Sequence, residues 1–195
     1  AKTLVGLKDR WKGTLMFIAQ PAEEVGAGAM AMLMDGLFLR FPKPDVGFAL
    51  HSGGGVLPPG HVGYTAGVRS SSADGLFIRF RGRGGHGAYP HATIDPIVMA
   101  AHLVLDLQSL VSRENKPTDP AVVTVGSIHG GTKHNIIGDT CHLQLTVRSY
   151  TPEVREKLIE GIRRKAKAVA DSAGAPAPQI EVSDENTPAL KNDEQ

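Results

Sequence analysis

Hydrophobic and polar positions follow two different patterns along the chain, and each pattern predicts a different kind of structure. Residues 14–19 and 45–51 are apolar stretches with almost no polar alternation, which is typical of strands buried on both faces of a parallel sheet. Between them, residues 26–38 have the periodicity of a helix. The pattern predicts a strand–helix–strand crossover, which brings the carboxyl ends of both strands to one edge of the sheet. Residues 2–10 are expected to end an earlier helix.

Later in the chain apolar and polar residues alternate strictly, which predicts strands with one solvated face. Amphipathic helices separate these strands, and Asp95 is expected to cap the first helix with proline at its first position. The order of elements, βαββαβ, is that of a ferredoxin-like layer of helices on an antiparallel sheet. The predicted strands are 76–81, 121–128, 141–148 and 179–182, and the predicted helices begin at Asp95-Pro96 and Thr151-Pro152.

A glycine- and proline-rich stretch separates the two patterns. It runs from Ser52 to Gly60 and has the composition of a linker. We therefore expect three segments: residues 1–61 in an α/β domain, residues 62–183 in a second domain with the ferredoxin-like order, and residues 184–195 returning into the first.

Composition narrows the class of protein. A chain of 195 residues can bury a real core, and its net charge of +1 gives no overall attraction to nucleic acid or membranes. Cys141 is the single cysteine, so an internal disulfide is excluded; it lies on the apolar face of a predicted strand, which favours a packing role. No apolar run reaches the roughly 20 residues of a membrane helix. These features favour the cytoplasm but leave the compartment open.

Candidate metal ligands follow the two predicted buried strands. Gln20-Pro21 ends the first strand, because proline cannot donate to a strand ladder, and the adjacent carboxylates Glu23 and Glu24 come directly after it. His51 ends the second strand, so the crossover brings it to the same edge of the sheet. Carboxylate and imidazole groups that converge there suit zinc. Taken alone, the acidic pair could be a solvated start of a helix, and His51 could be a hydrogen-bonded histidine at a strand end. Their combination favours a metal site.

The glycine-rich segment from Gly82 to Gly87 matches the pattern G-x-G-x-x-G of dinucleotide-binding folds. In those folds the last glycine already lies in a helix whose N-terminus meets the pyrophosphate. Here Pro90 and Pro96 delay the helix by about two turns. We therefore reject nucleotide binding and interpret the segment as a loop that presents His86, either as a functional group or as a solvated loop residue.

Several of these motifs, in this order, resemble the dinuclear zinc aminoacylase–carboxypeptidase family, and within it the hippurate hydrolase and indoleacetyl-amino-acid hydrolase branch. The resemblance covers nearly the whole chain. It is carried by Gln20-Pro-Ala-Glu-Glu24, His51 after a buried strand, Gly84-Gly-His-Gly-Ala-Tyr-Pro90, Asn135-Ile-Ile and Thr146-Val-Arg148.

The resemblance implies a role for each matching residue. Glu23 would be the general base, and Glu24 and His51 would be metal ligands. The family's inserted ferredoxin-like domain is a lid that forms a homodimer. Its residues here, His86, Asn135 and Arg148, would contact the substrate carboxylate or the tetrahedral intermediate, with His86 reaching the partner subunit's site. Arg148 could instead be a surface ion-pair partner at a strand end.

The resemblance further implies a metal-dependent amidohydrolase that cleaves N-acyl or N-aroyl amino acids, or small peptides. Two zinc ions per full-length chain are expected, with manganese or cobalt as other candidates. The family's remaining metal ligands fall before Ala1 and after Gln195, so the sequence is expected to be an internal part of a longer enzyme, inactive by itself. The alternative is a non-catalytic dimerisation or binding module that has kept Glu23, Glu24 and His51 as remnants.

Overall fold

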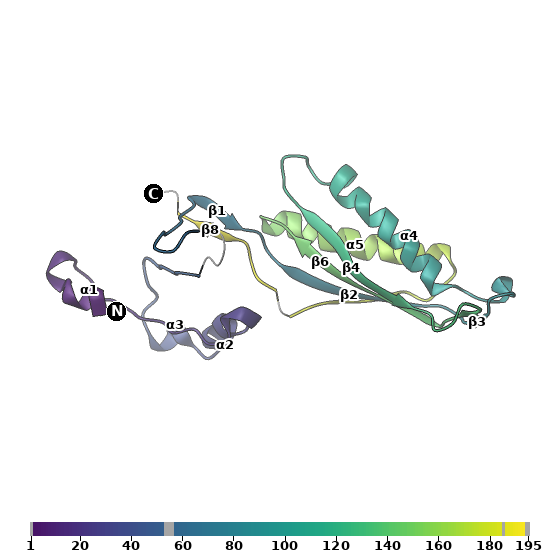
Figure 1. The fold of residues 1–195 in the computed structure, drawn as a ribbon, viewed down its shortest axis with the longest axis horizontal. Coiled ribbons are helices and arrows are strands. Elements are labelled where there is room, and N and C mark those ends of the chain that lie inside the picture. Colours follow the sequence, from purple (N-terminus) through teal and green to yellow (C-terminus); the bar gives the residue numbers. More distant parts are fainter. Residues whose placement is uncertain (1, 53–56, 185, 194–195) are drawn as a thin grey trace. The chain divides into compact units, whose positions relative to one another are not determined.

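The computed structural model describes residues 2–52, 57–184 and 186–193. The chain divides into two compact units, residues 1–63 and residues 64–195, each of which is described by itself below (Figure 1). Residues 53–56 of the predicted linker lie outside the described residues. The predicted segment boundaries near residues 61 and 183 stay predictions.

The second unit has the βαββαβ order expected from the sequence. Its four main strands form one sheet in the order β4-β6-β2-β7, and every neighbouring pair is antiparallel. This strand order, with two helices in the connections, is the ferredoxin-like arrangement, so that prediction is confirmed. The elements are β2 (Asp74–Arg81), α4 (Pro96–Ser109), β4 (Val122–Gly130), β6 (Thr140–Arg148), α5 (Pro152–Ser172) and β7 (Gln179–Val182).

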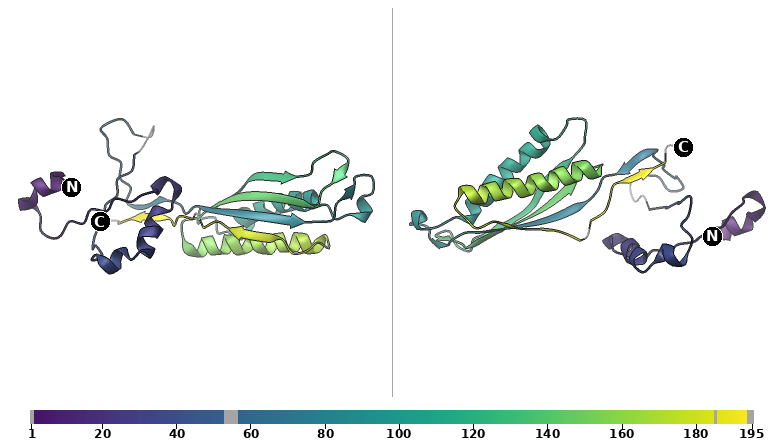
Figure 2. Two further views of the ribbon diagram at one scale, coloured as in Figure 1. Left: turned by 90° about the horizontal axis from the view of Figure 1, so that it is seen from below. Right: turned by 180° about the vertical axis from the view of Figure 1, so that it is seen from behind.

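Alternation along the strands decides which face of the sheet is buried. In β2, Leu76, Ile78 and Phe80 are at most 1% exposed, whereas Phe77 between them is 44% exposed. Helices α4 and α5 lie against the buried face and leave the other face uncovered (Figure 2). The predicted packing role of Cys141 is confirmed, since it is buried in this core, and burial raises the pKa of its thiol.

The helices begin at the predicted caps. The Asp95 carboxylate accepts hydrogen bonds from the Ile97 and Val98 amides, and Thr151 accepts one from Val154, with proline first in each helix. After α4 the chain makes a π-helical turn, Leu110–Glu114.

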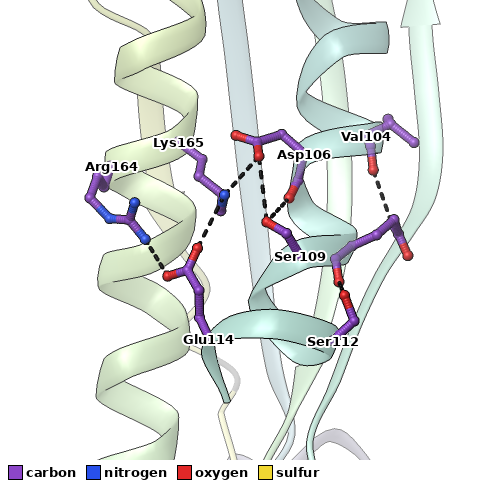
Figure 3. A network of polar contacts seen from close by, with 8 residues as sticks. Val104, Asp106, Ser109, Ser112, Glu114, Arg164 and Lys165 are labelled. Atoms are coloured by element: carbon purple, nitrogen blue, oxygen red, sulfur yellow. Dashed lines mark hydrogen bonds and ion pairs between the residues drawn. The ribbon is translucent and has the colours of Figure 1, made fainter.

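Ion pairs fix the helices to each other and to the sheet. Lys165 on α5 is buried and donates to Asp106 on α4 at 2.7 Å, while its ammonium lies 3.2 Å from the Glu114 carboxylate (Figure 3). Burial by itself lowers the pKa of Lys165, but the hydrogen bonds to both acids outweigh it, so the pKa is raised. At the start of β2, Arg155 of α5 donates to both oxygens of the fully buried Asp74 carboxylate, at 2.6–3.0 Å. These contacts set the position of α5.

Short elements extend both ends of the second unit. At one end β1 (Gly67–Ser70) pairs with β8 (Leu190–Asn192), and at the other β3 (Gly85–His86) pairs with β5 (Ile136–Ile137). A 3₁₀ turn, η3 (Pro90–Ala92), follows β3. Because β1 pairs with β8, described residues after 183 form part of this unit's structure.

The first unit contains only helical segments among its described residues. They are α1 (Lys2–Gly6), η1 (Lys8–Arg10), η2 (Glu23–Val25), α2 (Gly28–Met34) and α3 (Leu37–Arg40). The predicted helix over residues 26–38 is divided at Gly36, whose φ of +85° belongs to the left-handed region that favours glycine.

The predicted strands at residues 14–19 and 45–51 are wrong, because neither stretch is a strand in the structure. A strand needs a hydrogen-bonded neighbour, and no described residue of the first unit supplies one. Phe17 and Phe48 are accordingly 74% and 98% exposed. The predicted parallel crossover is therefore not formed. No helix in the described part of the chain is long and apolar enough to cross a membrane.

Candidate functional site

A tight turn carries the adjacent carboxylates of the first unit. Glu23 and Glu24 begin the 3₁₀ turn η2, between Ala22 and Gly26, which both have left-handed backbone conformations with φ of +52° and +68°. A non-glycine residue seldom adopts that conformation. The chain therefore reverses sharply on either side of the acidic pair.

The structure brings His51 to this pair, as the sequence analysis expected, although by turns and loops and not by strands. One ligand atom from each of Glu23, Glu24 and His51 lies within 4.8 Å of the others, and all three residues are exposed. The Nε2 atom of His51 is 3.4 Å from Oε1 of Glu23, and Nδ1 lies 2.9 Å from the Ser52 carbonyl oxygen. A hydrogen bond from Nδ1–H to that carbonyl leaves the Nε2 lone pair for a metal ion, a common arrangement in metal sites.

Electrostatics at His51 favour a cation beside the two acids. The hydrogen bond to the Ser52 carbonyl raises the pKa of His51, and the negative charge of Glu23 raises it further. Both effects stabilise the protonated imidazole. Two carboxylates and one imidazole are a ligand set that suits zinc and similar divalent ions. The three residues could hold a metal ion; the roles of Glu24 and His51 as its ligands and of Glu23 as the general base stay predictions.

The glycines of the 82–87 segment allow close backbone packing in the second unit. A Cβ atom on Gly82 would lie 2.0 Å from the Ile94 carbonyl oxygen, and one on Gly84 would lie 2.6 Å from that of Ile137. The Gly84 amide also donates to Asp139 at 2.8 Å. Helix α4 begins only at Pro96, so the last glycine of the segment, Gly87, lies outside the helix, in line with the rejection of nucleotide binding.

His86 lies at the tip of this loop, on the short strand β3. It pairs with Ile136 of β5, and its side chain is exposed. The Ala88 amide donates to its Nδ1 at 3.1 Å, so the neutral imidazole carries its proton on Nε2. His86 can therefore donate a hydrogen bond outward to an oxyanion. Tyr89 stands beside it, with ring centroids 5.7 Å apart.

Asn135 is next to the same loop, which the sequence could not show. The Gly87 amide donates to the Asn135 carbonyl at 2.8 Å, a contact that binds the histidine loop to the asparagine segment. The Oδ1 atom of the Asn135 side chain is buried and has no hydrogen-bond partner among the described residues. The structure thus brings His86 and Asn135 together across about 50 residues of sequence.

Arg148 lies at the opposite end of the sheet from His86 and Asn135. It is the last residue of β6, whereas Thr140, the first residue, adjoins the histidine loop. Eight steps of a strand at about 3.4 Å each separate the two ends by about 27 Å. Within a single chain, Arg148 therefore does not meet His86 and Asn135.

An open pocket of about 350 Å³ adjoins Arg148. Lys116 and Tyr150 line it beside the arginine, and apolar side chains of the loop between α4 and β4 form another part of its wall. The sequence analysis had not selected Lys116 or Tyr150. In the sequence, Tyr150 could have been noticed because it is close to Arg148, and Lys116 because it precedes the prolines at positions 117 and 120.

Comparison with known proteins identifies the family of this chain. The sequence model of the peptidase dimerisation domain of the M20 group matches residues 68–173, which is more than half of the chain. The chain belongs to this family. The matched residues contain the whole unit from β2 to α5, so the resemblance stated from the motifs is confirmed.

Similar proteins extend beyond the dimerisation domain. The chain is 40% identical to the N-acetyldiaminopimelate deacetylase of Priestia megaterium over 158 residues, which cover 81% of this chain and 42% of that protein. It is 45% identical over 144 residues to the enzyme of the same name from Halalkalibacterium halodurans, covering 74% of this chain and 38% of that one.

Among solved structures, the Bacillus subtilis YXEP protein, described as a dinuclear metal-binding peptidase of the M20 family, matches 98% of this chain and 46% of its own. The TM-score is 0.68 and the sequence identity 29%. The present chain thus spans less than half the length of the relatives that it matches.

Proposed function

We propose that this chain is part of a metal-dependent amidohydrolase that cleaves the amide bond of N-acyl or N-aroyl amino acids or small peptides. The convergence of Glu23, Glu24 and His51 within 4.8 Å is the observation that carries the proposal. The names of the relatives support it, because they describe deacetylases and a dinuclear metal-binding peptidase.

In this proposal Glu24 and His51 hold a divalent metal ion, for which zinc is the first choice and manganese or cobalt the others. A metal centre with two ions in the full-length chain would polarise the scissile carbonyl and lower the pKa of a bound water. Glu23 takes a proton from the attacking water and passes it to the leaving nitrogen. Its carboxylate suits that task because it lies beside the ligands.

The lid residues divide between two sites in this proposal. His86 presents an Nε2–H donor, and Asn135 is fixed next to it by the contact between Gly87 and its carbonyl. Both would stabilise the oxyanion in the partner subunit's site. Arg148, about 27 Å away along the sheet, would bind a substrate carboxylate, because its guanidinium can donate two parallel hydrogen bonds.

Dimerisation through the lid follows from its surface. Strand β4 is at the edge of the sheet and offers unpaired backbone groups, which invite pairing with another strand. On α4, Val98 and Leu105 are 51% and 73% exposed, although such apolar side chains usually avoid water. We propose that β4 and α4 together form the homodimer interface.

Metal titration tests the proposed site on the chain as it stands. Zinc should bind at the three-residue cluster, and His51→Gln should weaken binding because an amide replaces the imidazole nitrogen. His61→Gln is the matched control, since His61 is exposed in the same unit and outside the cluster. Equal zinc affinity in the wild-type chain and in His51→Gln would favour the non-catalytic dimerisation module.

A further inference from the structure

The uncovered face of the sheet carries a polar row that crosses all four main strands. Register places His129 of β4 opposite His142 of β6, His142 opposite Arg79 of β2, and Arg79 opposite Gln179 of β7. Neighbouring strands lie about 4.8 Å apart, so adjacent members of the row are within side-chain reach. Helices α4 and α5 lie on the other face (Figure 2) and leave this row open.

A hollow of about 270 Å³ adjoins this row. This volume is below the roughly 300–1,000 Å³ of pockets that hold drug-sized ligands, so the hollow suits a smaller molecule. The ring of Phe77, which is 44% exposed, offers one apolar wall. The other side chains on the uncovered face that line the hollow are polar or charged: Arg79, His142, Gln144, Gln179 and Glu181.

Positive charge at the hollow is not neutralised within the protein. Arg79 forms no ion pair with a carboxylate in the part of the chain that the structure describes, and its buried Nε has no hydrogen-bond partner there. Arg81, two residues along β2, donates to the neutral Gln179 at 3.5 Å and is not one of the residues that line the hollow. Glu181 is the one acid that lines the hollow. The Arg79 guanidinium therefore lies at the hollow with one carboxylate, Glu181, with which it forms no ion pair among the described residues.

The row favours an anion over a metal ion. The facing pair His129 and His142 could chelate a metal ion, but Arg79 stands directly beside His142, and its fixed positive charge repels a second cation. A guanidinium instead matches the two oxygens of a carboxylate, which it can bind with two parallel hydrogen bonds. The amides of Gln144 and Gln179 offer further donors, and Phe77 an apolar surface for the rest of the molecule.

We propose that this hollow binds a small monocarboxylate, with Arg79 holding the carboxylate group and Phe77 contacting the apolar body. The site is separate from the Glu23, Glu24 and His51 cluster and from Arg148. It does not depend on the proposed hydrolase activity, because binding at the lid requires neither metal nor turnover.

Benzoate titration of the ¹⁵N-labelled chain, followed by NMR at constant ionic strength, tests the site. Saturable shifts should centre on the amides of Phe77, Arg79 and His142. Arg79→Gln should weaken benzoate binding about tenfold or more, as expected for loss of a charge-assisted hydrogen bond. Glu181→Gln should strengthen it about two- to fivefold by removing a like charge. Arg163→Gln is the matched control, since Arg163 on α5 pairs with Glu160 and lies outside the hollow.

A neutral probe and an inorganic anion test which feature of benzoate the hollow recognises. Benzamide should bind more weakly than benzoate, and inorganic phosphate should not reproduce its shifts at Phe77. Equal binding of benzamide would overturn the role of Arg79, and equal binding of phosphate would reduce the site to a general anion surface. Zinc shifts centred on His129 and His142, with none from benzoate, would replace the proposal by a metal site. If Arg79→Gln does not fold, the Glu181→Gln variant decides: an unchanged benzoate affinity in that variant would overturn the monocarboxylate site.

Discussion

Phe48 and Phe80 are both phenylalanines in stretches that the sequence predicts to be strands, yet Phe48 is 98% exposed and Phe80 is 0% exposed. Phe80 lies in β2, between two antiparallel neighbours and under the helices of the second unit. Phe48 lies in a segment of the first unit with no hydrogen-bonded neighbour strand in the described residues. Hydrophobicity alone therefore does not make a strand; a partner strand must be available to it.

The two units also differ in how they position polar groups. In the second unit Asp74 and Lys165 are buried and held by partners on other elements. In the first unit Glu23 and His51 are exposed and meet by turns. Removing one partner of a buried pair is costly because it leaves a buried charge unpaired, whereas exposed ligand atoms that converge stay accessible to a ligand. The first unit thus exposes its candidate metal ligands with little packing around them, whereas the second unit buries its polar pairs within a packed core.

The largest expected effect concerns the chemistry of the first unit. In the proposed full-length amidohydrolase, Glu23→Gln should lower the rate of amide hydrolysis by roughly 10²–10⁴-fold, because the amide cannot take a proton from water. Metal content should stay unchanged, while Glu24→Gln should lower it. Asp45→Asn, an exposed acid of the same unit, should change neither quantity. Loss of metal in Glu23→Gln with full activity in Glu24→Gln would reverse the two roles.

The next effect compares packing in the two units directly. Leu143→Ala should lower the free energy of unfolding by roughly 2–5 kcal/mol, because Leu143 lies in the core and leaves a cavity. Phe48→Ala should change it by no more than about 0.5 kcal/mol, as is usual at the surface. Urea denaturation followed by circular dichroism measures both. A cost of several kcal/mol for Phe48→Ala would mean that residues 45–51 are buried in solution.

Breaking the Asp74–Arg155 pair should cost about 3 kcal/mol of unfolding free energy. That value is at the low end for buried pairs, because Arg155 is 35% exposed while Asp74 is fully buried. Arg155→Met leaves the Asp74 carboxylate without its cation and releases α5 from β2. Arg163→Met, in an exposed pair, should cost at most about 1 kcal/mol in the same denaturation series. Equal losses would show that Asp74 is solvated.

The smallest effect is the pH dependence of Lys165. Lys165→Met should lower the unfolding free energy by about 1.5 kcal/mol, since two charged hydrogen bonds are lost and both acids keep partial access to water. The folded pKa is raised above the ordinary 10.5, so the native state holds the proton more tightly than the unfolded chain. The stabilisation is thus complete below pH 10.5 and declines as the pH rises through the folded pKa.

A pH series of denaturation curves for the wild-type chain and Lys165→Met checks that prediction. Their difference should be constant below pH 10.5 and shrink above it. A difference that grows with pH would show that the two acids do not stabilise the Lys165 ammonium.

The sequence by itself determined the second unit well. Strict alternation predicted β2 and β6, the Asp95-Pro96 and Thr151-Pro152 starts predicted both helices, and their order predicted the sheet. These signals are local. Each strand also finds its neighbouring strand within the same unit, where hairpins and short crossovers connect them. The acidic pair and His51 were found from residue type and spacing, although the strands thought to carry them are absent.

Only the tertiary structure decided which distant residues meet. Asn135 joins His86 because β3 pairs with β5, while Arg148 lies at the far end of β6. The row of His129, His142, Arg79 and Gln179 likewise depends on strand register, which includes a bulge between Val125 and Ser127 that shifts every later pairing of β4 by one residue. A sequence pattern states which face a side chain occupies, but register and strand order decide its neighbours, because hydrogen-bond pairing between strands is set by the whole sheet.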